Sequence, residues 1–210
     1  MFHNRSEAGS LLAEKLIKYQ GMPGVLLAVP RGGVPVAYEV ATKLDLPLDI
    51  VLIKKLGHPS NKEYAIGAVG LDDIFISPGA GVSELYIQDQ ALKIRSRLRE
   101  MKKLFMEDKE PENIFGKTII IIDDGVATGN TLLATIRILR KSQPAKIIVA
   151  APVISKKAAD ILSTEADEVI AVMIPETFYG VGAFYEDFTQ VSDDEVVSYL
   201  DKLRELGRTA

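Results

Sequence analysis

One stretch near the middle of the chain, KTIIIIDDGVATGNT at Lys117–Thr131, constrains the fold more than any other. Its four consecutive isoleucines, Ile119–Ile122, are typical of a strand buried on both faces of a parallel sheet. Asp123 and Asp124 follow at the carboxyl end of that strand, and a loop of small and hydroxyl residues comes next. Apolar residues then recur at helical spacing. The pattern therefore predicts a strand, an acidic pair, a small-residue loop and a helix.

The residues of this stretch favour a sugar phosphate as ligand. Ligands of open α/β sheets bind outside the carboxyl ends of strands. A loop of Gly, Thr and Asn at a helix N-terminus presents backbone amides to an anion, usually a phosphate. Asp123 and Asp124 would repel that anion, but they accept hydrogen bonds from a diol. A turn whose aspartates only cap the helix is the alternative, and it needs one aspartate, not two.

The segment IIIIDDGVATGNT resembles the phosphoribosyl pyrophosphate (PRPP) signature of the type I phosphoribosyltransferases. It lacks the GK[ST] ending of a Walker A loop. The resemblance implies a Mg²⁺-dependent enzyme that moves the 5-phosphoribosyl group of PRPP to a nitrogen acceptor, a nucleobase or related heterocycle, and releases pyrophosphate. The expected ribose 5-phosphate site comprises Asp123, Asp124, Gly125, Val126, Ala127, Thr128, Gly129, Asn130 and Thr131.

A strand and a glycine turn also occur earlier in the chain. The short apolar run Val25–Val29 leads into Pro30, Arg31, Gly32 and Gly33, and a helical pattern follows. Two glycines let the backbone approach a ligand closely, and Arg31 adds a fixed positive charge. On its own the turn would be an ordinary βα turn with a surface arginine. The resemblance implies a pyrophosphate loop here, with a non-proline cis peptide close to Arg31, Gly32 and Gly33.

Two lysines follow the next apolar run. Leu48–Ile53 is the expected second strand, Lys54 and Lys55 stand at its end, and LGHPSNKEYA has the composition of a loop. Each lysine alone would be an ordinary strand flank. The resemblance implies a basic residue against the pyrophosphate, for which we choose Lys55 over Lys54, and a flexible loop at about 55–64 that closes over the site. His58 in this loop either acts on substrate or is simply solvated.

Aromatic residues gather near the C-terminal end. Residues 178–188 hold five of the fourteen aromatic residues, and glycines among them argue against a regular helix. These rings either plug one edge of the sheet or stack on a planar acceptor. Type I phosphoribosyltransferases carry a hood that varies with the acceptor, which implies a hood at about 175–192. The acceptor candidates are Phe178, Tyr179, Phe184 and Tyr185. The hood patterns of adenine, hypoxanthine–guanine, orotate and uracil enzymes are not evident, so the acceptor is left open.

The alternation of strands and helices predicts an α/β fold. We expect a doubly wound, mostly parallel sheet with helices on both faces, in a single domain 1–210 with a small hood. A long helix is expected at 84–106, and its segment 93–103 carries six basic residues against one acidic residue. Because no aromatic residues interleave there, a solvated face is preferred over a nucleic-acid surface. A third reading brings one of its arginines to the site of this subunit or of a neighbouring one.

Composition excludes several function classes. The chain has no cysteine, so it has no thiol nucleophile, disulfide or cysteine-bound metal. A net charge of −4 gives no general attraction to nucleic acid or anionic membranes. With no signal-peptide pattern and no membrane-length apolar stretch, the expected location is the cytoplasm.

The sequence-based hypothesis is an enzyme whose catalytic residues are Asp123, Asp124, Lys55 and Arg31. Mg²⁺ would be held mainly through PRPP, with no direct protein ligand. The partners would be PRPP and the acceptor, and a homodimer is possible. One alternative is a PRPP-binding regulatory protein without turnover. A weaker alternative is a sugar-phosphate hydrolase or kinase, for which a Walker A motif, a metal-ligand cluster and an activated nucleophile are missing.

Overall fold

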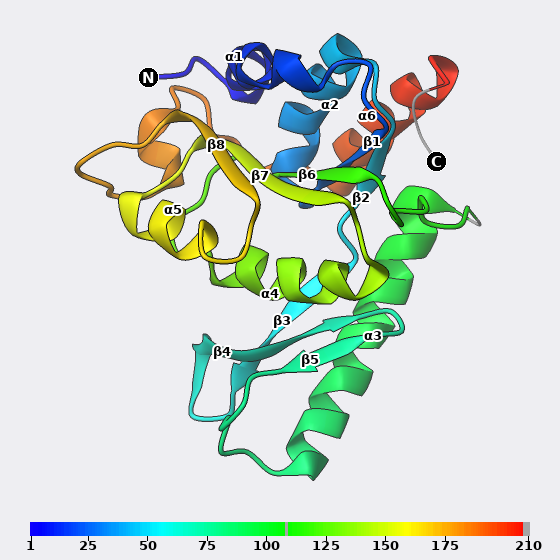
Figure 1. Ribbon diagram of the computed structural model, residues 1–210, viewed down its shortest axis with the longest axis vertical. Helices are drawn as coiled ribbons and strands as arrows, with labels where there is room; N and C mark the ends of the chain where they lie inside the picture. Colours follow the sequence, from blue (N-terminus) through cyan, green and yellow to red (C-terminus); the bar gives the residue numbers. More distant parts are fainter. Residues whose placement is uncertain (108, 208–210) are drawn as a thin grey trace.

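The computed structural model describes residues 1–107 and 109–207, which form two β-sheets and the helices around them (Figure 1). The predicted domain 1–210 also includes residue 108 and residues 208–210, which lie outside the described residues. The strands are β1 (Gly24–Ala28), β2 (Leu48–Ile50), β3 (Ile53–His58), β4 (Asn61–Gly70), β5 (Ile74–Ile76), β6 (Thr118–Ile122), β7 (Lys146–Val153) and β8 (Glu168–Met173). The α-helices are α1 (Arg5–Leu16), α2 (Gly33–Leu44), α3 (Glu84–Met106), α4 (Asn130–Leu139), α5 (Lys156–Leu162) and α6 (Asp193–Glu205).

The larger sheet has five parallel strands, and the isoleucine run forms its central strand, β6. Ile120 and Ile122 pack into the core on one face, whereas Ile119 and Ile121 pack into the core on the other. All four side chains are fully buried. Side chains of a strand alternate between the two faces of a sheet, so a strand covered on both sides must be apolar throughout. The predicted buried strand is therefore confirmed.

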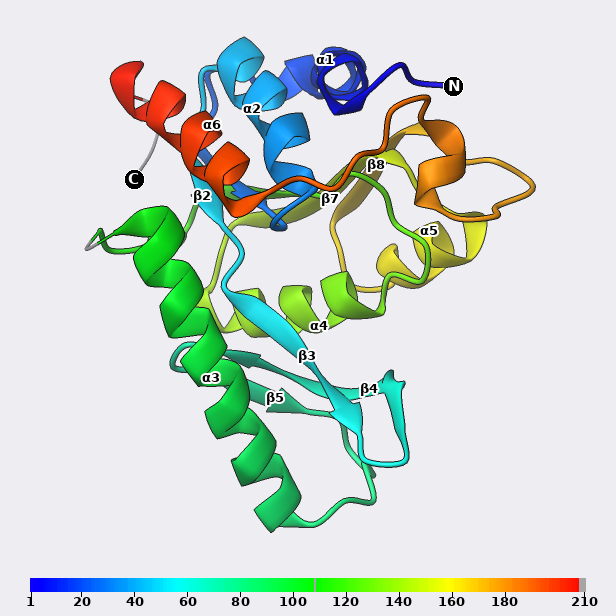
Figure 2. The same ribbon diagram turned by 180° about the vertical axis from the view of Figure 1, so that it is seen from behind.

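Helices cover both faces of this sheet, as expected. Figures 1 and 2 show α1, α2 and α6 on one face, with α4 and α5 on the other. The apolar side chains of each group belong to a separate core cluster against its own face of the sheet. This three-layer arrangement confirms the predicted doubly wound α/β fold.

The strand order of the larger sheet is β2-β1-β6-β7-β8. The second strand, β2, lies on one side of β1. The later strands β6, β7 and β8 follow one another on the other side. The order therefore reverses between β1 and β6. A crevice forms at such a switch point, outside the carboxyl ends of the two strands. The β1–α2 turn and the β6–α4 loop thus flank the expected ligand position.

The smaller sheet, β3-β4-β5, is antiparallel and is a feature that the sequence interpretation only partly anticipated. The short apolar runs Ala65–Val69 and Ile74–Ser77 predict two strands of a hairpin, and the antiparallel pairing of β4 with β5 confirms it. The single strand expected at Leu48–Ile53 is wrong, because β2 ends at Ile50 and the chain enters the second sheet at Ile53. Lys54 and Lys55 consequently lie inside β3 and not at the end of a strand. An apolar run that crosses from one sheet to another has the same composition as one continuous strand.

The segment expected as a loop, about 55–64, lies largely in strands β3 and β4. The two strands pair antiparallel from Ile53↔Gly70 to His58↔Asn61, with register shifts around Gly57. Pro59 and Ser60 make the turn between them. The glycine, proline and serine that suggested a loop thus mark an irregular register and a tight hairpin turn.

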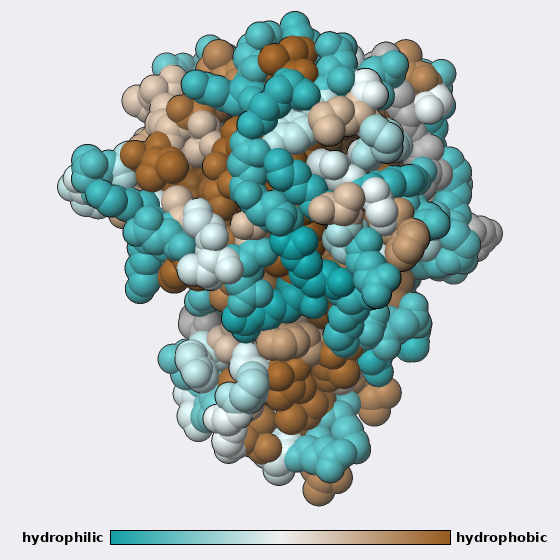
Figure 3. Space-filling view, viewed as in Figure 1, coloured by the Kyte–Doolittle hydropathy of each residue, from teal (hydrophilic) through white to brown (hydrophobic). Residues whose placement is uncertain are grey.

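Helix α4 joins the two sheets by packing on both. Its Leu132 and Ile136 face the larger sheet, whereas Ala134 and Ile138 pack with Ala68 of β4. Helix α3, predicted with the same bounds, covers the smaller sheet. Figure 3 shows apolar surface on this lobe, and α3 exposes Leu85 and Leu92. Among the described residues, no helix combines the length and apolar character needed to cross a membrane.

Candidate active site

The acidic pair lies directly after β6, at the switch point of the sheet. Both aspartates are partly buried, and Oδ1 of Asp123 accepts a hydrogen bond of 2.9 Å from the backbone N–H of Asp124. Burial raises the pKa of Asp123 well above its usual range, and the neighbouring Asp124 carboxylate raises it further. Two carboxyl groups in contact resist simultaneous ionisation. This pair therefore offers closely spaced carboxyl oxygens, and Asp123 holds a proton more readily than an exposed aspartate does.

The β6–α4 loop has the form of an anion site. Gly129 has φ of +73°, which favours glycine, and it is the N-cap residue of α4. Because glycine has no side chain, it leaves the first amides of α4 open to an external anion. Thr128 and Thr131 are exposed beside these amides. Val126, which belongs to the predicted site, is a buried core residue, and its backbone N–H and carbonyl oxygen are both hydrogen-bonded within the protein.

Hydrogen bonds from the β7–α5 turn hold the β6–α4 loop in place. The backbone N–H of Val126 donates to the carbonyl oxygen of Val153 at 2.9 Å, and that of Ser155 donates to the carbonyl oxygen of Val126 at 2.9 Å. The Ser155 hydroxyl donates to the carbonyl oxygen of Ala127 at 2.6 Å. The same hydroxyl oxygen accepts from the N–H of Ala158 and caps α5. Buried Ser155 therefore fixes both the loop and the next helix.

The β1–α2 turn lies in contact with the acidic pair. A Cβ atom on Gly32 would lie 2.0 Å from Oδ2 of Asp124, and one on Gly33 would lie 2.7 Å from the carbonyl oxygen of Ile122. Both positions thus need glycine for close approach.

The peptide bond between Pro30 and Arg31 is cis, at the turn where the resemblance implied one. Arg31 is half-buried, and its Nη1 lies 3.6 Å from Oδ1 of Asp193 at the start of α6.

The two lysines reach the same region from the smaller sheet. Lys54 and Lys55 line a cavity together with Pro30 of the β1–α2 turn and Thr131 at the start of α4. The cavity is also lined by Val29, Val51, Ile53 and Met101. Although the lysines do not end a strand of the main sheet, the fold still brings them to the predicted pyrophosphate turn.

His58 lies at the far end of β3, where its Nδ1 accepts from the N–H of Ser60 at 3.2 Å.

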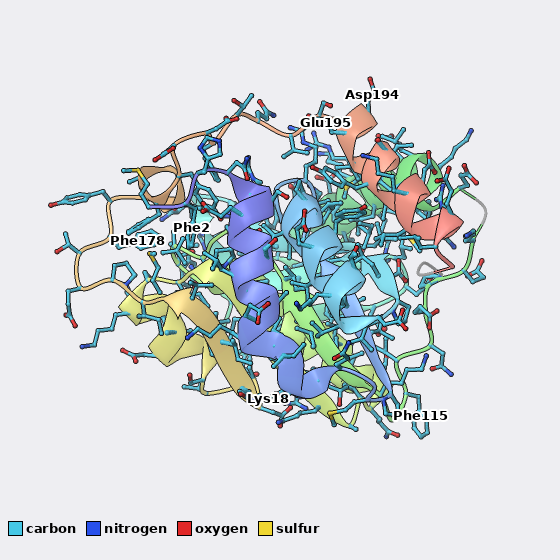
Figure 4. The ribbon with its side chains drawn as sticks, turned by 90° about the horizontal axis from the view of Figure 1, so that it is seen from above. Phe2, Lys18, Phe115, Phe178, Asp194 and Glu195 are labelled. Atoms are coloured by element: carbon cyan, nitrogen blue, oxygen red, sulfur yellow. The ribbon has the colours of Figure 1, made fainter. Side chains whose placement is uncertain are left out.

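The aromatic residues of the segment between β8 and α6, at about 175–192 and called the tail below, pack mostly against one another. The Phe178 and Phe184 ring centroids are 5.4 Å apart, and Tyr185 stacks on Phe188 at 4.9 Å. Phe2 joins this cluster, with its ring 5.3 Å from that of Tyr185, and Figure 4 shows Phe2 close to Phe178. Tyr185 is only 5% exposed, whereas Tyr179 is 87% exposed. These rings thus form a small core of their own together with Phe2.

The tail contacts the acidic pair through Tyr185 and Val181. The Tyr185 hydroxyl donates to the backbone carbonyl oxygen of Asp124 at 2.6 Å. Burial raises the pKa of this phenol, so it remains a donor at neutral pH. Val181 lies so close to Gly125 that a Cβ atom there would come within 2.4 Å of it. The tail is therefore seated directly on the beginning of the β6–α4 loop.

Sequence reasoning missed Arg5, the first residue of α1. Its Nε donates to Oδ2 of Asp124 at 2.9 Å, and both side chains are more than four-fifths buried. In the sequence, Arg5 belongs to an amphipathic helix pattern, and Asn4 before it is a helix cap. Those signals predict the start of a helix but give no indication of a contact that spans 119 positions.

Magnesium is compatible with the donors at this site. Among the described residues there is no group of three or more His, Cys, Asp or Glu side chains placed to hold a metal. Asp123 and Asp124 offer carboxylate oxygens beside the turn that faces the lysines. Mg²⁺ often keeps only one or two protein carboxylates and takes its other ligands from substrate phosphates and water. The two aspartates fit that pattern.

Comparisons with known proteins agree with this geometry. The phosphoribosyl transferase domain family matches residues 3–189. A Mycobacterium tuberculosis protein with a provisional phosphoribosyl transferase name, found in two strains, is 36% identical over 207 residues. That match covers 96% of this chain and 47% of the relative, so the chain spans about half the length of the curated relatives it matches.

Solved structures extend the comparison to the fold. The crystal structure of TT1426 from Thermus thermophilus is 37% identical, with a TM-score of 0.88 over 100% of this chain and 99% of that one. A Neisseria gonorrhoeae protein crystallised with bound ppGpp is 15% identical, with a TM-score of 0.50 over 99% of this chain and 97% of that one, and it supports the fold alone. With the family match over most of its length, this chain belongs to the phosphoribosyltransferase family.

Proposed function

We propose that the protein transfers the 5-phosphoribosyl group of PRPP to a nitrogen acceptor and releases pyrophosphate. The observation that carries this proposal is the direct contact of the β1–α2 turn with the acidic pair, where Gly32 meets the carboxylate of Asp124. The β6–α4 loop, the acidic pair and the β1–α2 turn thereby lie side by side at the switch point. PRPP has a phosphate, a diol and a pyrophosphate in the same succession.

Each part of the site has a distinct proposed role. Backbone amides and hydroxyls of the loop Gly125–Thr131 hold the 5-phosphate, and Asp123 and Asp124 accept hydrogen bonds from the ribose hydroxyls. Amides of the turn at Gly32 and Gly33 hold the pyrophosphate, together with Arg31, Lys54 and Lys55. As the bond from ribose C1 to pyrophosphate breaks, the sugar gains positive charge and the leaving group gains negative charge. The site accelerates this step by positioning both groups and neutralising the leaving group.

Mg²⁺ would join this arrangement through the substrate. When bound, it supplies positive charge to the pyrophosphate oxygens that receive the electron pair. The chain's own contribution is the cationic side chains Arg31 and Lys55 on one side and the carboxylates on the other. Asp124 lies closest to the turn, so it is the residue placed to stabilise the cationic sugar.

The acceptor would bind between the tail and the ribose position. Among the aromatic candidates, Tyr179 is exposed and Phe178 and Phe184 are partly buried, so their rings can still meet a planar heterocycle. Tyr185 has a different proposed role, because its ring is buried against Phe2 and Phe188. We propose that it holds the backbone of Asp124 in place and does not stack on the acceptor.

Calorimetry with PRPP and Mg²⁺ tests the ligand site. The double variant Asp123→Asn/Asp124→Asn should lose PRPP binding, because an amide is a weaker acceptor for hydroxyls and leaves no charge for the cation. Asp160→Asn, an exposed carboxylate of α5, is the matched control and should bind as the wild type does. Unchanged affinity in the double variant would refute the site assignment.

A screen for turnover tests the reaction and identifies the acceptor. Pyrophosphate release from PRPP is measured with nucleobases and other nitrogen heterocycles, one at a time. Release that depends on one acceptor, and disappears in the double variant, supports the transferase. Tight PRPP binding with no release for any acceptor would instead support a PRPP-binding regulatory protein of the same fold.

A further inference from the structure

The guanidinium of Arg5 contacts three segments that are far apart in the chain. Its Nε donates to Oδ2 of Asp124 at 2.9 Å, and its Nη1 donates to the backbone carbonyl oxygen of Thr189 at 2.8 Å. Its Cζ lies 4.0 Å from the ring centroid of Phe188. Helix α1, the β6–α4 loop and the tail therefore meet at one side chain. A planar guanidinium can make these contacts together, whereas a lysine ammonium cannot.

Other contacts place this junction firmly against the acidic pair. The Tyr185 hydroxyl holds the backbone of Asp124 on the side of the tail, and the backbone N–H of Phe2 donates to the carbonyl oxygen of Phe184 at 2.8 Å. The side chains of Arg5 and Asp124 are 11% and 14% exposed, respectively. A buried ion pair of this kind keeps its geometry better than a pair on the surface. Arg5 therefore fixes which way the Asp124 carboxylate points.

The charge of Arg5 also acts on the neighbouring carboxyl. It opposes the rise in the pKa of Asp123 that burial and Asp124 cause. Arg31, the nearest cation on the β1–α2 turn, is directed to Asp193. The other titratable groups influenced by the charge of Arg5 are Tyr185, Asp187, Glu195 and Tyr199. None of these is a second cation that could replace Arg5 beside the pair.

From these contacts, and on the basis of the proposed function, we infer that Arg5 is a positioning residue for the ribose hydroxyls. It holds the Asp124 carboxylate in place and links that carboxylate to the tail through Phe188 and Thr189. The ribose site and the tail next to the expected acceptor are thereby coupled through one ion pair. Changes in the tail should reach PRPP binding even where the changed residue does not touch PRPP.

The first test compares PRPP affinity in four proteins: wild type, Arg5→Gln, Arg5→Lys and the control Lys15→Gln. Lys15 is an exposed cation of the same helix. At neutral pH we expect Arg5→Gln to weaken PRPP binding by about tenfold or more. Arg5→Lys keeps the charge but not the planar fork of the guanidinium, so it should recover only part of the lost affinity.

Three results would overturn the inference. They are wild-type affinity in Arg5→Gln, an affinity in Arg5→Lys no higher than that of Arg5→Gln, and an equal loss in Lys15→Gln. A wild-type protein that does not bind PRPP would instead refute the proposed function, so the two failures are distinguishable. If Arg5→Gln does not fold, judged by thermal melting, Arg5→Lys carries the test: full wild-type affinity in that variant would then contradict the inference.

The second test is a double-mutant cycle between Arg5 and Phe188. Phe188→Leu removes the ring beside the guanidinium and leaves Asp123 and Asp124 unsubstituted. We expect it to weaken PRPP binding, and we expect the double variant Arg5→Lys/Phe188→Leu to be weakened by less than the product of the two single effects. Independent effects, or no effect of Phe188→Leu on PRPP affinity, would show that the tail and the ribose site are not coupled through Arg5.

Discussion

Gly32 packs directly against the carboxylate of Asp124, so that a Cβ atom at residue 32 would lie 2.0 Å from Oδ2 and 2.7 Å from Cγ of that side chain. The same Oδ2 accepts the hydrogen bond from Arg5. The same carboxylate oxygen therefore contacts both the β1–α2 turn and helix α1. The absence of a side chain at Gly32 thus leaves the space that the carboxylate of Asp124, after β6, occupies.

The first prediction follows from this contact. Gly32→Ala should displace the Asp124 carboxylate and weaken PRPP binding by about tenfold or more, since the clash is with the group proposed to bind ribose. Calorimetry with PRPP and Mg²⁺ measures the change. Gly70→Ala is the control, because its Cβ would approach no atom closer than 3.7 Å and its φ is not positive. Equal PRPP affinity in Gly32→Ala and wild type would show that the β1–α2 turn can move to accept the methyl group without any loss of binding.

The second prediction concerns the contact of the tail with the β6–α4 loop. A Cβ on Gly125 would lie 2.4 Å from Cγ1 of Val181, so Gly125→Ala should push the tail away and reduce the free energy of unfolding by roughly 1–3 kcal/mol. Val181→Ala removes the obstructing methyl groups. The double variant should therefore be more stable than Gly125→Ala, as measured by urea denaturation. A strictly additive result would mean that the two residues do not meet.

The third prediction separates the two lysines of β3. Both line the cavity at the β1–α2 turn, but Lys54 is exposed and Lys55 is half-buried. Charges that are less screened by water act more strongly on a bound anion. We therefore expect Lys55→Ala to weaken PRPP binding more than Lys54→Ala does. Titration of both variants with PRPP and with pyrophosphate alone measures the difference, and the reverse order would identify Lys54 as the main pyrophosphate contact.

The fourth prediction concerns stability at low pH. Hydrogen bonds from Lys18 and Tyr19 to Glu168, at the start of β8, lower the pKa of that carboxyl from 4.5 to about 2. Because the pKa is lower in the folded state, the contribution to stability is present above pH 4.5 and is lost as pH falls toward 2. Partial exposure limits this contribution to about 1 kcal/mol.

The variant Glu168→Gln tests this prediction. It should unfold more easily than the wild type at neutral pH, and the difference should vanish as pH approaches 2. Urea denaturation at several pH values measures this, with Glu176→Gln, an exposed glutamate, as the control. A difference that persists unchanged at the lowest pH would show that packing, and not charge, is responsible.

The main sheet could be predicted from sequence because its strands have a strong local signal. A run such as Ile119–Ile122 has few structural uses other than a strand covered on both sides. The residues that follow it include the acidic pair and the glycine loop, so the same local pattern also located the candidate site. Glu84–Met106 was predictable for a similar reason, since a long amphipathic helix repeats its signal over many turns.

The parts that sequence did not predict depend on contacts between distant segments. The change of sheet between Ile50 and Ile53 leaves no local mark, because the residues from Ile50 to Ile53 are an unbroken apolar run. The aromatic tail indicated a cover for the site, but only the structure shows that Phe2 from the N-terminus completes its core. Arg5 meets Asp124 across 119 positions, and no periodic pattern reports such a contact.

The Ser155 hydroxyl, which caps α5 and also holds the carbonyl oxygen of Ala127, has a consequence for ligand affinity. With that contact made within the protein, the backbone at Ala127 is held in place before any ligand arrives. If the β6–α4 loop binds phosphate as proposed, part of the entropic cost of ordering it is met on folding and not on association. Ser155, on a neighbouring strand–helix connection, would then raise the affinity for phosphate without contacting it.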